Sequence, residues 1–141
     1  MDQEDKKDFV LNVFSLLPDN HPYLSPIKVQ KLFFLIEKRL GKAGTYFDFQ
    51  PYLYGPYDSK LKAVINELVK DEKMEIEKHN NLSLYKIVKR ANTDDFLTKA
   101  ERDYIQCTLI PFVLQKSFRE LCFAIYNEFP EMKVNSVLIQ E

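Results

Sequence analysis

The residue types that most often carry catalysis are few in this sequence and widely spaced. His21 and His79 lie in a predicted loop and beside a predicted turn, and no Cys, His, Asp or Glu stands at metal-ligand spacing from either. Cys107 and Cys122 fall in apolar helical patterns, which is typical of reduced core thiols. These residues predict surface histidines, buried thiols and no metal site.

Carboxylates and hydroxyls are equally weak candidates for catalysis. Glu75 and Glu77 would share one face of a strand, but neighbouring lysines favour a solvated face over an acid–base pair. The serines and threonines that could act as nucleophiles precede predicted helices, where they act as N-caps. The sequence therefore predicts a protein without enzymatic activity, metal or other cofactor.

The binding chemistry is concentrated in residues 46–58, where six of 13 residues are aromatic and a Gly-Pro pair forms a turn. Tyrosines around a rigid turn offer a large contact area at low entropic cost, as in protein–protein hot spots. The alternative is that single tyrosines belong to the core with only their hydroxyls at the surface. The predicted partner-binding residues are Tyr52, Tyr54, Gly55, Pro56, Tyr57 and Asp58.

DNA binding is the second candidate function. The order helix, helix, strand, helix, hairpin has the parts of a winged helix-turn-helix, with 59–70 as recognition helix and 74–88 as wing. Against it, the net charge is −1, with 20 basic and 21 acidic residues, and a long segment separates the second and third helices. The candidate contacts are lysines for phosphates and an asparagine for a base edge: Lys60, Lys62, Lys70 and Asn66.

Helices must position most of these residues. Apolar residues recur with helical spacing over 6–17, 27–40 and 59–70, and the wide stripe of 27–40 predicts the most buried helix. A polar loop is predicted at 19–23, and Asp58 is well placed to cap the third helix. Capping-box patterns at Thr98/Glu101 and Ser117/Glu120 predict further helices in 97–132, with Pro111 as a kink.

Two segments predict strands. Residues 46–53 alternate, with Phe47, Phe49 and Leu53 on one face, although Pro51 confines such a strand to an edge or ends it. Residues 74–88 predict a hairpin around Asn80-Asn81, since asparagine tolerates the positive φ of a tight turn. Its register pairs Met74 with Ile87, Ile76 with Tyr85 and Glu75 with Lys86. Together the strand 46–53 and the hairpin predict one small antiparallel sheet.

The chain has 141 residues, of which 45% are apolar and only three are glycine. This length and composition predict a single domain over 1–141 with a mainly helical α+β fold. We expect about five helices and an arrangement that is winged-helix-like in part. No apolar run approaches the ~20 residues of a membrane span. The start Asp2-Gln3-Glu4-Asp5 lacks the basic-then-apolar pattern of a signal peptide. We therefore expect a cytoplasmic protein without a membrane partner.

Three segments in this order resemble the Panacea (SocA-like) antitoxin domain family of prokaryotic and phage-associated proteins. They are 28–35 (KVQKLFFL), 54–58 (YGPYD) and 125–131 (IYNEFPE). The resemblance covers 25–90 best and the C-terminal helical part, 97–132, more loosely. It implies a helix carrying Gln-Lys-Leu, a strand ending in Tyr-Gly-Pro, and a further helix.

The family resemblance also implies a function: a non-enzymatic module that neutralises a cognate toxin protein, in a toxin–antitoxin or phage-defence context. It places Gln30 and Lys31 near the Gly55-Pro56 turn, where Gln30 is expected to hydrogen-bond the turn backbone. A winged-helix DNA-binding regulator and a phage-associated accessory protein remain as alternatives, and a homo-oligomer is a further candidate assembly.

Overall fold

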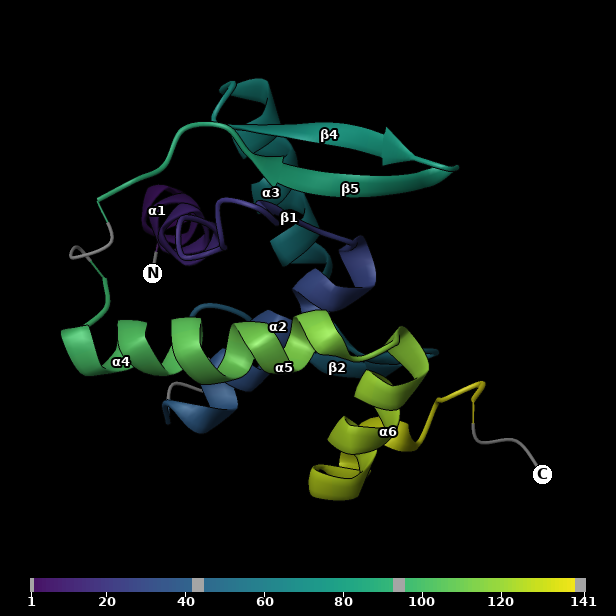
Figure 1. Cartoon of the computed structure of the whole chain (residues 1–141). Coiled ribbons are helices and arrows are strands. Elements are labelled where there is room, and N and C mark those ends of the chain that lie inside the picture. Colours follow the sequence, from purple (N-terminus) through teal and green to yellow (C-terminus); the bar gives the residue numbers. More distant parts are fainter. Residues whose placement is uncertain (1, 42–44, 93–95, 139–141) are drawn as a thin grey trace.

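Helix α2 (Pro26–Arg39) runs through the middle of the molecule in the computed structural model, which describes residues 2–41, 45–92 and 96–138 (Figure 1). The helix begins at Ser25, whose side chain accepts a hydrogen bond from the Lys28 N–H. Nine of its residues are buried, and Phe33 and Ile36 are wholly excluded from solvent. The prediction that this is the most buried helix is confirmed.

Two helices on the N-terminal side pack against each other. Helix α1 (Gln3–Phe14) contacts helix α3 (Ser59–Lys70), and the Lys7 ammonium lies 2.6 Å from the Asp71 carboxylate just beyond α3. The bounds of α3 match the prediction, and Asp58 caps it by accepting a hydrogen bond from the Lys60 N–H.

The hairpin of β4 (Met74–His79) and β5 (Leu82–Ile87) confirms the predicted register. Met74 pairs with Ile87, Ile76 with Tyr85, and Glu75 with Lys86. Asn80 and Asn81 take positive φ values of 50° and 71°, as a two-residue turn requires. Short-range pattern and turn chemistry were therefore sufficient to define this element.

The predicted membership of the sheet was wrong. The third strand beside the hairpin is β1 (Tyr23–Leu24), which falls at the end of the predicted polar loop, so the order is β1-β5-β4. Residues 46–53 do not join it: only β2 (Gln50–Tyr52) is a strand, and it pairs with β3 (Gly55–Tyr57) in a separate two-stranded sheet.

Tyr46, Phe47 and Phe49 are buried without belonging to a strand, because side chains accept hydrogen bonds from the backbone N–H groups of residues 46–48. The Glu37 carboxylate accepts hydrogen bonds from the N–H groups of Tyr46 and Phe47, each at 2.9 Å. The Asp58 carboxylate accepts from the Asp48 N–H at 2.8 Å. With these donors satisfied by helix-borne and capping carboxylates, the segment needs no neighbouring strand.

The C-terminal part is helical, as predicted. Helix α4 (Lys99–Tyr104), a π-helical turn (Ile105–Leu109) and α5 (Ile110–Gln115) follow one another as a continuous rod (Figure 1). Pro111 was predicted to kink this helix, but the rod continues through it. The wider π turn just before Pro111 accommodates the missing N–H and the bulk of the ring. Helix α6 (Phe118–Glu128) and a 3-10 turn (Pro130–Lys133) follow, and both predicted capping boxes are present.

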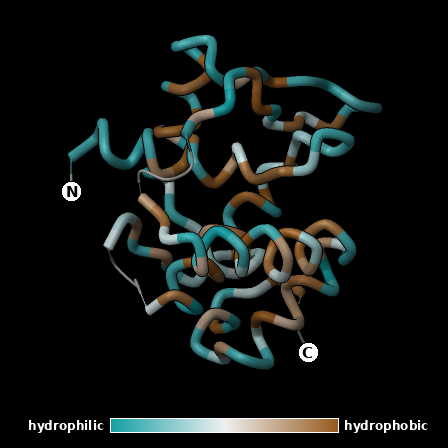
Figure 2. Tube along the Cα trace, turned by 60° about the vertical axis from the view of Figure 1, so that its left-hand side comes forward, coloured by the Kyte–Doolittle hydropathy of each residue, from teal (hydrophilic) through white to brown (hydrophobic). Residues whose placement is uncertain are grey.

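The fold is a mainly helical α+β domain, as predicted. The succession α1, β1, α2, α3, β4, β5 with β1 beside β5 has the arrangement of a winged helix, interrupted between α2 and α3 by residues 40–58. Hydrophobic segments recur through the middle of the molecule, whereas the first turn of α1 is hydrophilic (Figure 2). Within the described ranges, no helix has both the length and the apolar character needed to cross a membrane.

Candidate protein-binding site

Residues 50–58, here called the corner, form a tight reversal of β2 into β3 and then into α3. Gly55 has φ +91°, a conformation that side-chain-bearing residues rarely adopt. A Cβ there would lie 3.4 Å from Lys31 Cε and 3.5 Å from Tyr126 Cε1. The corner therefore packs against α2 and α6 at ordinary contact distance, and it is the positive φ of Gly55 that explains the glycine.

Gln30 of α2 fixes the end of the corner. The Asp58 N–H donates to the Gln30 side-chain oxygen at 2.9 Å, and the Gln30 amide group donates to the Asp58 carbonyl at 3.1 Å. Both residues are buried, so these two bonds replace water for both backbone groups. Gln30 was expected to hydrogen-bond the backbone of the Gly55-Pro56 turn; its partner is instead the backbone of Asp58, two residues further on.

Lys31, the next residue of α2, holds the middle of the corner. Its ammonium donates to the Pro56 carbonyl at 3.0 Å, and the residue is only 2% exposed. Burial lowers the pKa of Lys31 from 10.5 to about 8, an effect that the nearby Cys122 offsets only in part. Within the described ranges, no carboxylate forms an ion pair with Lys31.

Helix α6 and the chain after it hold the other side of the corner. The Cys122 thiol donates to the Tyr54 carbonyl at 3.2 Å, and burial raises the pKa of this thiol, which favours its neutral form. The Val137 N–H donates to the Leu53 carbonyl at 3.0 Å, and Asn135 donates to the Pro51 carbonyl at 2.8 Å. Five residues of the corner are thus hydrogen-bonded to the surrounding helices or to the chain after α6: Pro51, Leu53, Tyr54, Pro56 and Asp58.

The structure divides the predicted partner-binding residues into two groups. Tyr52 and Tyr54 are 51% and 43% exposed, and Tyr57 is half-buried with its ring stacked on Tyr52 at 4.9 Å. Gly55, Pro56 and Asp58 are buried. The first group forms surface, whereas the second shapes the backbone that presents it.

Leu53 is an exposed apolar residue, whereas the sequence pattern predicted it to be buried. Alternation along 46–53 predicted it on the buried face with Phe47 and Phe49, but 54% of it is exposed. Strand β2 ends at Tyr52, so Leu53 lies in the turn, where strand alternation no longer applies.

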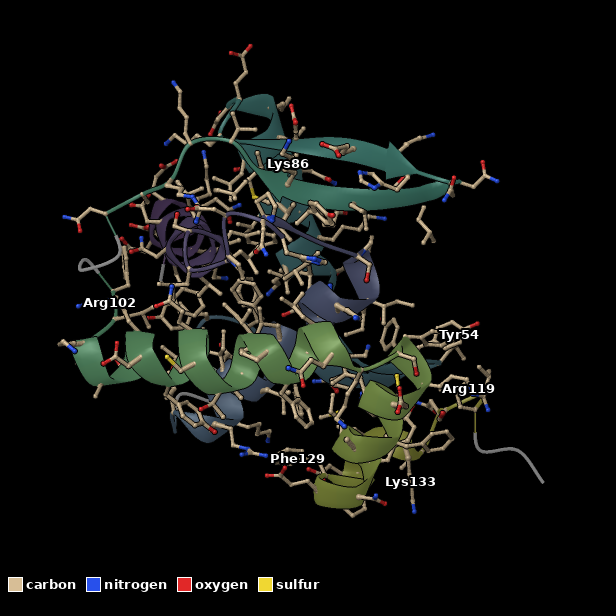
Figure 3. All side chains as sticks on the ribbon, in the orientation of Figure 1. Tyr54, Lys86, Arg102, Arg119, Phe129 and Lys133 are labelled. Atoms are coloured by element: carbon tan, nitrogen blue, oxygen red, sulfur yellow. The ribbon has the colours of Figure 1, made fainter. Side chains whose placement is uncertain are left out.

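Figure 3 shows Tyr54, the residue after Leu53, beside the first turn of α6 and near Arg119.

Two adjoining grooves lie next to the corner. The first, of about 550 Å³, is lined by the corner tyrosines, Leu53, the start of α2, α3 and the hairpin residue Ile76. The second, of about 590 Å³, lies between β1, the start of β5, Leu114 and Phe118. Pro26, Ile27 and Ser83 line both grooves, which therefore adjoin at these residues.

Exposed apolar side chains gather around these grooves. Of nine large exposed apolar residues in the described chain, six line one groove or the other. Tyr54 also meets Phe118 edge-to-face at 6.0 Å, which joins the corner to α6. The six are Tyr52, Leu53, Tyr54, Ile76, Leu82 and Phe118. Such clustering on one face is typical of an interaction surface.

The four candidate DNA contacts are all exposed on α3, but they do not share one environment. Lys62 and Asn66 line the first groove. Lys60 and Lys70 line neither groove. The nearby carboxylate of Asp71 is engaged by Lys7, which reduces its effect on this face.

The remaining candidates for chemistry stay apart. His21 is half-buried and lines the second groove, and burial, with a smaller contribution from Lys28, lowers its pKa. His79 contacts Glu77 on the exposed hairpin. Among the described residues, no three His, Cys, Asp or Glu side chains come together as a metal site would require.

A scan against models of known protein families and a search among curated proteins both found no match to this chain. The resemblance to the Panacea family therefore stays a prediction, and the geometry of the corner and grooves carries the functional argument.

Proposed function

We propose that this chain is a non-enzymatic protein-binding module of antitoxin type, which acts in the cytoplasm by binding and neutralising a toxin protein through the corner. The observation that carries the proposal is the exposure of Tyr52, Leu53 and Tyr54 on a backbone held by buried side chains. A surface fixed before binding loses little conformational entropy when a partner docks.

The composition of the surface supports a protein partner. Aromatic side chains dominate the energetics of many protein interfaces, and two stacked tyrosines beside an exposed leucine form such a cluster. The proposal fits the toxin–antitoxin or phage-defence context of the resembling family, where the toxin is a separate protein.

The direct test is co-expression with a small toxic protein encoded beside the gene for this chain. We expect this chain to restore growth and to co-purify with the toxin, and Leu53→Ser to abolish both effects. Val88→Ser is the matched control, because Val88 is similarly exposed (50%, against 54% for Leu53) and lines neither groove. Equal rescue by both variants would show that the corner is not the binding surface.

A winged-helix DNA-binding regulator is the second candidate, because β1 pairs with β5 and α3 presents three exposed lysines. This candidate function predicts that the protein shifts the electrophoretic mobility of DNA from upstream of the gene for this chain, in a sequence-dependent way. The affinity for this DNA should fall steeply as the salt concentration rises. A shift of this kind at physiological salt, without any protein partner, would favour this candidate over the antitoxin proposal.

A further inference from the structure

We propose that the two grooves form one channel that binds an extended segment of a partner protein carrying acidic and apolar side chains. The inference rests on the proposed function in so far as the partner is a protein. It adds the chemistry of the segment that is recognised and the residues that recognise it.

The charged side chains that line the channel are all lysines. Lys31 and Lys62 line the first groove, and Lys28 lines the second. His21 also lines the second groove, but its lowered pKa favours the neutral ring at pH 7. None of the described lining residues is Asp or Glu, although the chain has 21 acidic residues against 20 basic ones. A surface that gathers cations and excludes carboxylates in a nearly neutral protein is complementary to an acidic ligand.

Two of these cations are already partly stripped of water. The Lys31 ammonium donates to the Pro56 carbonyl, and the Lys28 ammonium donates to the Leu114 carbonyl at 3.3 Å. Burial lowers the pKa of both ammonium groups. Because much of the desolvation cost is already present in the folded protein, an incoming carboxylate would gain more from these cations than from exposed ones.

Apolar side chains supply the second half of the recognition. Leu53, Tyr54 and Ile76 border the first groove, and Leu82 and Phe118 border the second. A channel with this lining binds a segment whose apolar residues enter the grooves while its carboxylates meet the lysines. Nucleic acid would meet the lysines but would leave most of this apolar surface without a matching contact, so a peptide is favoured.

The open edge of β5 favours an extended conformation. Strand β5 pairs with β4 along its whole length, but β1 pairs only with Tyr85 and Lys86. In the described chain no strand lies beside Leu82, Ser83 and Leu84 on that side, and these three residues line the second groove. An extended segment entering there can add hydrogen bonds to the free edge.

The first experiment identifies the chemistry without a known partner. A display library of random peptides of about 12 residues, long enough to cross both grooves at ~3.3 Å per residue, is selected against the full chain. We expect the selected peptides to contain a clear excess of Asp and Glu over Lys and Arg, together with aromatic or aliphatic residues. Selected peptides without an acidic excess would overturn the inference.

The second experiment locates the binding with a synthetic peptide from that selection. We expect Lys62→Gln to weaken binding by about 3- to 10-fold, or about 0.7–1.4 kcal/mol. Lys60→Gln is the matched control, since Lys60 is exposed on the same helix but lines neither groove. Leu53→Ser should also weaken binding. Equal affinities for Lys60→Gln and Lys62→Gln, or no effect of Leu53→Ser, would contradict the channel.

The third experiment tests whether a carboxylate reaches Lys31. A carboxylate near this ammonium raises its pKa, so binding at pH 8 should take up protons, measured by calorimetry in two buffers of different ionisation enthalpy. The groups packed against Lys31, Cys122 and Tyr126, have raised pKa values and stay largely neutral at this pH. Proton uptake on binding should be smaller for Lys31→Met than for the wild type. If that variant does not fold, the same test is made on the wild type with a peptide in which Gln replaces Glu. Proton uptake equal to that of the unaltered pair would contradict the inference.

The outcomes separate this inference from the proposed function. Acidic peptides that bind the channel, without any toxin that binds the protein, would support the channel and contradict the antitoxin role. A toxin that binds equally well to wild type, Leu53→Ser and Lys62→Gln would support neutralisation and place it on another surface.

Discussion

Gln30 and Asp58 exchange two hydrogen bonds across 28 positions of sequence, and through them the central helix determines where α3 begins. The Gln30 side chain accepts from the Asp58 N–H at 2.9 Å and donates to the Asp58 carbonyl at 3.1 Å. The Asp58 carboxylate in turn accepts from the N–H groups of Asp48 and Lys60. The Gln30 side chain thus joins α2 to the end of the corner. Through the Asp58 carboxylate, this link extends to the segment before the corner and to the start of α3.

We predict that Gln30→Ala lowers the free energy of unfolding by about 1–3 kcal/mol, because it leaves the buried Asp58 N–H without a partner. The Asp58 carbonyl loses one of two hydrogen bonds and keeps the one from the Leu61 N–H. Chemical denaturation measures the change, and Gln115→Ala, an exposed glutamine at the end of α5, should change it by less than about 0.5 kcal/mol. Partner binding by Gln30→Ala should weaken as well. Stability and binding that both matched wild type would remove Gln30 from the account of the corner.

Gly55→Ala should destabilise the fold more than Gly41→Ala does. Both glycines have positive φ, +91° and +68°, so alanine strains either by about 1–2 kcal/mol. The φ of Gly55 lies further from the left-handed region at about +57° that residues with a Cβ can reach, so the strain should be larger there. The new Cβ itself would meet Lys31 and Tyr126 only at ordinary contact distance. Thermal melts of the two variants give the comparison. An equal loss in both would mean that the backbone conformation of Gly55 does not constrain the corner.

Lys31 gives the stability a characteristic dependence on pH. Its pKa falls from 10.5 to about 8 on burial, so between these values the unfolded chain binds more protons than the folded one. Stability from this group is therefore lowest below pH 8 and rises toward pH 10. Because one pKa unit corresponds to about 1.4 kcal/mol, the wild type should gain about 2–3 kcal/mol relative to Lys31→Met between pH 7 and 10.

Denaturation of both proteins across this range isolates Lys31 together with the Cys122 thiol that interacts with it, because the other titrations are common to the two proteins. A difference between wild type and Lys31→Met that stays flat across the range would mean that Lys31 retains an ordinary pKa.

The lysines of α3 distinguish a protein-binding surface from a DNA-binding one. If the channel is the functional site, Lys62→Gln weakens partner binding while Lys60→Gln and Lys70→Gln do not, since only Lys62 lines a groove. If α3 binds DNA, all three neutralisations weaken it by similar factors and each reduces its salt dependence. Parallel titrations with peptide and with DNA, at two salt concentrations, decide between the two patterns.

Local signals in the sequence were sufficient for most individual elements. Asp58 and Ser25 predicted helix starts, and the Asn80-Asn81 pair with alternating neighbours predicted the hairpin and its register. These predictions succeeded because capping, turn formation and amphipathic spacing depend on residues only a few positions apart. The tyrosine-rich segment was also recognisable as the place where binding chemistry gathers.

The sequence could not show which segments become neighbours. Residues 46–49 alternate like a strand, yet Glu37 and Asp58 take their backbone donors, and the place beside β5 goes to Tyr23–Leu24. Alternation reports that one face is buried but not what satisfies the backbone, and this competition is settled only when the whole chain packs.

The sequence by itself determined a mainly helical domain, a hairpin and an aromatic turn, because these follow from local spacing and backbone preference. Only the tertiary structure decided that Leu53 faces solvent, that Gln30 and Lys31 of the central helix hold the corner, and that three lysines line two adjoining grooves. Burial and shared surface are properties of residues far apart in the chain, so they arise only from the packing of α2, α3, α6 and the hairpin around residues 50–58.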